Sequence, residues 1–117
     1  MTQRILHLTK LEDRSEAVPL GYYSISTRDK TLQEVGFIHA STASQLSKAA
    51  SFVYRDYLGE LLILELDLAQ LEAAGLKVLF EDGGNGELFP HIYGPIPVEL
   101  VITTKPAVMV EGNLQSL

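Results

Sequence analysis

The segment from Leu61 to Asp67 reads LLILELD and is apolar at nearly every position. Successive side chains of a β-strand point to opposite faces, so a strand that is apolar at both sets of positions must be covered on both sides. We therefore predict a central strand here, buried on both faces. Glu65 interrupts the run, and we expect its face to meet solvent near the end of the strand.

Strands and short helices interleave along the rest of the chain. A helix is predicted over 43–55, because Thr42 and Gln45 fit a capping box and apolar residues then recur at helical spacing. Only the segment 61–80 has the spacing of a compact βαβ unit, so the pattern favours an α+β fold. The other predicted elements are strands at 5–9, 22–25, 37–41, 77–80 and 98–103, a helix or turn at 10–17, a short helix ended by Gly36, and a helix at 68–74.

Length and composition bound the class of protein. The chain has 117 residues, of which 46% are hydrophobic and 21% charged, and this predicts one folded domain over residues 1–117. The absence of cysteine excludes disulfides and thiol catalysis. A net charge of −6 disfavours nucleic acid as a partner.

The longest apolar run, Leu61 to Leu64, is too short to span a bilayer and no secretory segment is visible, so we expect a cytoplasmic protein with no membrane partner. The sequence does not identify a protein partner.

Two predicted strands carry the same small pattern, with a histidine two residues before a hydroxyl side chain. His7 precedes Thr9, and His39 precedes Ser41, each within an apolar run. Alternation places the histidine and the hydroxyl of each strand on one face. If both strands lie in one sheet with their apolar sides toward the core, these four side chains share the accessible face. Imidazole can donate, accept or transfer a proton near neutral pH, so the pattern indicates a site for a ligand or for acid-base chemistry.

The second of these strands leads directly into the predicted helix at 43–55. The free amides and positive dipole end of that helix would lie beside His39 and Ser41 and favour an anion. Thr42 is expected to cap the helix and to contact such a ligand. Arg55, at the other end, is expected either to cap the C-terminal dipole or to bind an anion.

The third histidine lies in the aromatic and proline-rich segment from Leu88 to Pro95. His91 and Tyr93 belong to this segment, and Glu87 precedes it after the glycine-rich stretch 83–86. We interpret residues 81–87 as a mobile polar loop, placed to act as a lid. Three histidines raise the possibility of zinc. The chain contains neither His-x-His nor His-x-x-x-His, so no metal site is predicted.

Several of these segments together resemble a small bacterial family known as domain of unknown function 952. The most specific stretches are Gly36 to Thr42, which reads GFIHAST, and Glu87 to Pro95, which reads ELFPHIYGP. The resemblance implies an ADP-ribosyltransferase-like fold, with two small packed β-sheets, short flanking helices and a central cleft for NAD. The strand at 6–9 looks like the one whose histidine orients the nicotinamide ribose, and 38–41 looks like the His-x-Ser strand of RNA 2′-phosphotransferases. The glutamate that stabilises the transition state in such transferases has its nearest counterparts in Glu87 and Glu99.

These observations lead to one main functional hypothesis and two alternatives. The main hypothesis is a histidine-lined cleft that binds NAD, as substrate, or a related phosphorylated nucleotide, with ADP-ribosyl or phosphoryl transfer as the associated chemistry. His39, His7 and Glu87 are the candidate catalytic residues. The candidate ligand-binding residues are Thr9, Ser41, Thr42, Arg55, His91 and Tyr93. The alternatives are a non-catalytic binding or interaction module with structural histidines, and a metal-dependent hydrolase.

Overall fold

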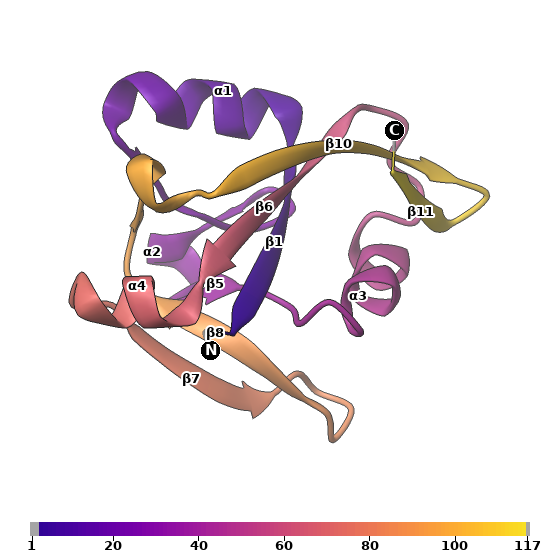
Figure 1. Cartoon of the computed structure of the whole chain (residues 1–117). Helices are drawn as coiled ribbons and strands as arrows, with labels where there is room; N and C mark the ends of the chain where they lie inside the picture. The colour runs from indigo at the N-terminus through magenta and orange to yellow at the C-terminus, as the bar shows by residue number, and fades with distance from the viewer. Residues whose placement is uncertain (1–2, 117) are drawn as a thin grey trace.

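The computed structural model describes residues 3–116 and has the mixed α+β character that the sequence predicts (Figure 1). Its helices are α1 (Leu11–Leu20), α2 (Leu32–Val35), α3 (Leu46–Val53) and α4 (Leu68–Ala73), with a 3-10 turn η1 (Val98–Leu100). The strands are β1 (Arg4–Lys10), β2 (Tyr22–Tyr23), β3 (Ile25–Thr27), β4 (Lys30–Thr31), β5 (Ile38–His39), β6 (Leu61–Asp67), β7 (Lys77–Asp82), β8 (Leu88–Tyr93), β9 (Ile96–Pro97), β10 (Thr103–Val110) and β11 (Asn113–Ser116).

The strands form antiparallel sheets of different sizes. The larger ones are a four-stranded sheet in the order β1-β6-β10-β11 and a three-stranded sheet in the order β5-β8-β7. Two further sheets, β2-β9 and β3-β4, have two strands each. The segment 61–80 is therefore no βαβ unit, because β6 and β7 belong to different sheets and α4 connects them.

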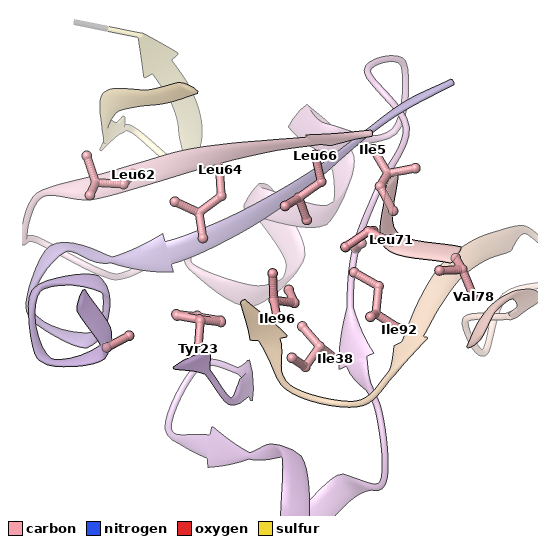
Figure 2. Packing of buried hydrophobic residues seen from close by; sticks show 12 residues of the cluster. Ile5, Tyr23, Ile38, Leu62, Leu64, Leu66, Leu71, Val78, Ile92 and Ile96 are labelled. Atoms are coloured by element: carbon pink, nitrogen blue, oxygen red, sulfur yellow. The ribbon is translucent and has the colours of Figure 1, made fainter. Parts of the chain in front are cut away.

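β6 is central in its sheet and is buried on both faces, which confirms the prediction for Leu61–Asp67. On one face Leu64 and Leu66 point into the main core toward hydrophobic side chains of other strands, among them Ile38 and Ile92 of the three-stranded sheet (Figure 2). On the other face Ile63 packs in a second cluster with Leu46 of α3. Each face of this strand therefore stabilises a different layer of the protein.

β1 is covered on both faces as well, and this overturns the predicted exposure of His7 and Thr9. Leu6 and Leu8 pack in the second cluster, which includes Leu46 of α3, while Ile5 lies in the main core. His7 and Thr9 share the face of Ile5 and are only 2% and 1% exposed. The alternation was predicted correctly, but the sequence of one strand does not show that both of its faces are buried.

The two larger sheets are joined where β1 meets the end of β5. The backbone amide of Leu6 donates to Ser41 and the amide of Ser41 donates to Leu6, both at 2.8 Å. Nδ1 of His7 lies 2.5 Å from the carbonyl oxygen of His39. The two His-x-Thr/Ser strands thus lie in different sheets, and this isolated bridge brings them together.

The other nitrogen of His7 is also occupied. Nε2 lies 2.7 Å from the hydroxyl of Tyr23, and that hydroxyl lies 2.7 Å from Oγ1 of Thr9. Burial, the largest influence, lowers the pKa of His7 to about 4, so the ring is neutral at pH 7. Its Nδ1–H then donates to the carbonyl of His39. His7 and Thr9 are consequently parts of a buried hydrogen-bond network.

The helix predicted over 43–55 is shorter than expected. α3 begins at Leu46 and ends at Val53, and residues 43–45 form a turn before it. Only half of the predicted capping box forms: the amide of Thr42 donates to the side chain of Gln45 at 3.0 Å, but no side chain caps α3. The Nε2 group of Gln45 also donates to the carbonyl oxygen of Leu88 at 2.7 Å, while the Thr42 hydroxyl lies 3.2 Å from that of Ser44 instead of capping the helix.

Several other boundaries also differ from the sequence-based expectation. β7 continues to Asp82 and β8 begins at Leu88, so the polar loop is confined to 83–87. The segment predicted as a strand over 98–103 contains η1 and only the first residue of β10. Gly36 ends α2 as predicted, with a φ of 102°. Within residues 3–116, no helix is long and apolar enough to cross a membrane.

The position of β6 makes a stability prediction. Leu64→Ala should lower the free energy of unfolding by about 2–5 kcal/mol, because the side chain is fully buried and its removal leaves a cavity. Leu58→Ala is the matched control, since Leu58 is 97% exposed, and it should change the free energy by less than about 0.5 kcal/mol. Urea denaturation measures both. Equal effects of the two substitutions would contradict the central position of β6.

The buried network makes a prediction about pH. The pKa of His7 is about 4 in the folded protein, below its ordinary value of 6.5, so the unfolded chain takes up a proton first as the pH falls. Stability is therefore lost between pH 6.5 and 4, by up to about 3 kcal/mol from this group. His7→Gln removes that contribution. The difference in unfolding free energy between wild type and variant should shrink through this window, and a constant difference would contradict a buried neutral His7.

Candidate functional site

The register of the three-stranded sheet gathers polar side chains on one of its faces. His39 of β5 lies directly opposite His91 of β8. Directly opposed residues of an antiparallel pair project from the same face, and residues two apart along a strand share it. Phe89 and Tyr93 therefore accompany His91, while Ile92 faces the main core. This histidine-bearing face is turned away from the core.

A pocket of about 470 Å³ is bounded by this face, by α3 and by β1. Its walls are largely apolar, and the polar groups come from the strands, from α3 and its C-terminal end, and from the loop after β7. Among the described lining residues, Lys48 carries the only formal charge and none is an aspartate or glutamate. Phe52, at 89% exposure, is an aromatic ring of the lining that faces solvent. The polar lining residues are His7, Ser26, Thr27, His39, Ser41, Lys48, Tyr54, Asn85 and His91.

His91 is held by a carboxylate that the sequence reasoning did not select. Oε1 of Glu81 lies 2.8 Å from Nδ1 of His91 and accepts a hydrogen bond of 2.5 Å from the hydroxyl of Tyr93. The bonds from Tyr93 and then His91 lower the pKa of Glu81, so it is ionised at neutral pH. The ring of Phe37 stacks on His91 at a centroid distance of 4.0 Å and an interplanar angle of 17°. His91 is thus fixed in position from two sides.

The second ring nitrogen of His91 has no hydrogen-bond partner in the described part of the chain. Nε2 is buried and forms no hydrogen bond with any group in residues 3–116. An unpaired buried polar group costs on the order of 1–3 kcal/mol, so such groups are rare in folded proteins. Because His91 also lines the pocket, the unpaired atom marks this end of the pocket as a candidate ligand contact.

His39 lies beside it with its ring 5.2 Å from that of His91. The ring is half-buried, and its nitrogens form no hydrogen bond with another residue in the described part of the chain. Burial and, secondarily, the neighbouring His91 lower the pKa of His39. Ser41 belongs to the same lining, and its backbone forms the bridge to Leu6. His39 and Ser41 are therefore available to a ligand.

Glu87 occupies a different position from the one that the sequence suggested. Its carboxylate accepts hydrogen bonds from Lys48 at 2.8 Å and from the side chain of Gln45 at 3.0 Å. These two bonds, in that order, lower the pKa of Glu87 and keep it ionised at neutral pH. It lies outside the pocket lining, next to Lys48, which belongs to that lining.

Four of the predicted ligand-binding residues also lie outside the lining. Thr9 is buried against Tyr23, and Thr42 belongs to the turn before α3. Arg55 is exposed and lies near Gly112 in the turn between β10 and β11, and Tyr93 donates to Glu81. The structure therefore brings together His7, His39, Ser41 and His91 of the predicted set, and leaves out Thr9, Thr42, Arg55, Tyr93 and Glu87.

Glu81 and Lys48 are the residues of this region that sequence reasoning missed. The loop predicted over 81–87 includes Glu81, although this residue continues the strand alternation that begins at Lys77. Placing it beside His91 requires the register of β7 against β8, in which Glu81 faces Phe89 and is diagonal to His91. As for metals, residues 3–116 contain no cluster of three or more His, Asp or Glu side chains arranged to hold an ion.

Comparisons with known proteins agree with this fold. Two crystal structures of protein CC0527 from Caulobacter crescentus, one of them a double mutant, are similar to this chain, with TM-scores of 0.80 for the mutant and 0.78 for the other, at 24% and 26% identity. Each covers 96% of this chain and 93% of that protein. Its solution NMR structure gives a TM-score of 0.72 at 22% identity, covering 95% of this chain and 90% of that one. A search of curated proteins found no match. One family model matches residues 8–104, and the chain therefore belongs to the family described as "Protein of unknown function (DUF952)".

Proposed function

We propose that this protein binds a small phosphorylated nucleotide, with NAD or a related compound as the leading candidate, in the pocket beside His39. The observation that carries the proposal is the charge of the lining. The chain has 15 acidic and 9 basic residues, yet the described lining contains one lysine, three histidines and no carboxylate. A pocket that excludes carboxylates from so acidic a chain suits an anionic ligand.

The shape and chemistry of the walls support the same class of ligand. Apolar groups of α3 and the exposed ring of Phe52 suit the flat body of a base, since most small-molecule pockets are apolar with a few polar groups that orient the ligand. His39 and Ser41 supply such polar groups, and Lys48 supplies a positive charge for a phosphate. The fold proposed for the family, that of the ADP-ribosyltransferase-like superfamily, would place NAD in a comparable cleft.

The proposal concerns binding rather than transfer chemistry. ADP-ribosyl transfer of the kind implied by the resemblance uses a glutamate beside the reacting centre, and neither Glu87 nor Glu99 lies in the lining. A shared fold does not by itself carry an activity. His39 is the residue on which we expect binding to depend most, because its ring nitrogens are free and it faces the pocket.

Isothermal titration calorimetry with NAD, ADP-ribose and AMP tests the proposal. Wild-type protein should bind at least one of them, and His39→Ala should abolish that binding. Lys48→Gln should weaken AMP by about tenfold while leaving adenosine unchanged, because one charge-assisted hydrogen bond contributes roughly 1.5–3 kcal/mol. Lys105→Gln is the matched control, since Lys105 is exposed on β10 and outside the lining. The absence of heat with all three nucleotides would reject the proposal.

Glu87→Gln separates two roles for Glu87. Because Glu87 holds Lys48 in an ion pair, its neutralisation should free the lysine and raise the affinity for AMP by about two- to threefold, since exposed ion pairs are weak. The same titration measures the change. A loss of affinity on this substitution would mean instead that the carboxylate itself serves the ligand.

A further inference from the structure

Tyr93, Glu81 and His91 form a short chain of hydrogen bonds that ends at the pocket. A carboxylate can only accept hydrogen bonds, so the 2.8 Å contact between Glu81 and Nδ1 of His91 places a proton on Nδ1. In the neutral ring, the second nitrogen is then an acceptor. The Tyr93 hydroxyl donates to the same oxygen of Glu81 and fixes the carboxylate in turn.

The acceptor Nε2 of His91 is held in place without a donor. His91 is 3% exposed, Phe37 stacks on its ring, and His39 meets the ring edge-on. No donor from residues 3–116 reaches Nε2. The ring cannot simply turn to find one, because the Glu81 bond and the Phe37 stack both oppose rotation. A fixed, unpaired acceptor on a residue that lines a pocket is suited to a donor carried by a ligand.

We propose that Nε2 of His91 accepts a hydrogen bond from a hydroxyl or amide N–H group of the bound ligand, with Glu81 and Tyr93 as positioning residues. This inference rests on the proposed function, because His91 lines the same pocket. It adds a requirement on the ligand, which must carry a hydrogen-bond donor close to His39. Ribose hydroxyls and the carboxamide of nicotinamide are groups of this kind, and a phosphate without a bound proton is not.

A carboxylate behind a histidine is a known way to set which ring nitrogen carries the proton. Glu81 is suited to that role because its side chain comes from β7, a strand paired with β8 over its whole length. Glu81 lies behind His91 and is not among the described residues that line the pocket. Glu81 influences the ligand only through the ring of His91.

Nitrogen-15 NMR of the histidine rings tests the positioning role without any ligand. At a pH where His91 is neutral, wild-type protein should show the proton on Nδ1. Glu81→Gln should retain this tautomer, because the glutamine carbonyl still accepts the bond, whereas Glu81→Leu should lose it. Glu72→Gln, at an exposed residue of α4, removes the same charge elsewhere and should have no effect. A proton on Nε2 in the wild-type protein would overturn the inference.

Titration of the same samples with NAD and AMP tests the contact itself. On binding, the Nε2 resonance of His91 should move in the direction that marks an accepted hydrogen bond. Glu81→Leu and His91→Phe should weaken binding by about tenfold, and Glu81→Gln by no more than about threefold. Binding that leaves Nε2 unchanged would overturn the inference alone. Failure of the wild-type protein to bind would contradict the proposed function and the ligand contact together, and the tautomer would still decide the role of Glu81.

Discussion

The bridge between Leu6 and Ser41 is the interaction on which the rest of this structure depends. It joins β1, at the edge of the four-stranded sheet, to the chain that leaves β5 in the other sheet. A side-chain hydrogen bond, from Nδ1 of His7 to the carbonyl oxygen of His39, joins the same two strands. His7 and Ser41 are buried, so these bonds form where water cannot readily replace them. With the sheets joined here, α3 can cover β1 on one side and border the pocket on the other.

This arrangement divides the three histidines by their surroundings. His7 has both nitrogens occupied and is neutral, so it serves the joint between the sheets. Within residues 3–116, the ring nitrogens of His39 form no hydrogen bond, and His91 has one nitrogen bonded to Glu81 and one without a partner. The same side chain thus stabilises the fold at one position and is available to a ligand at the other two. Burial alone does not separate these roles, because His7 and His91 are both buried; hydrogen-bond partners do.

Local patterns in the sequence predict much of the framework. The apolar run of β6 identifies a strand covered on both faces, and the glycine at position 36 identifies the end of α2. The pairing of His39 with Ser41 near the start of a helix also follows from local spacing, although α3 begins later than its capping residues suggest. These features depend on side chains within a few positions of one another, which is the range over which periodicity and capping act.

The remaining features depend on long-range pairing. The burial of His7 follows from Tyr23 and from the main core that its face of β1 meets, neither of which is visible in the β1 segment itself. Glu81 meets His91 only through the register of β7 against β8, and the side chain of Gln45 bonds to Leu88, which lies 43 positions along the chain. A change of register by one residue would move every side chain of a strand to the other face, so local sequence cannot specify such contacts.

The central claim is that the joined sheets and α3 form a nucleotide pocket. A crystal structure of the protein in the presence of NAD or AMP tests this claim most directly. The expected result is a ligand between α3 and the β5-β8-β7 sheet, with its phosphate near Lys48 and polar groups within hydrogen-bond distance of His39 and of Nε2 of His91. A nucleotide bound elsewhere on the surface, with both histidines untouched, would contradict the claim.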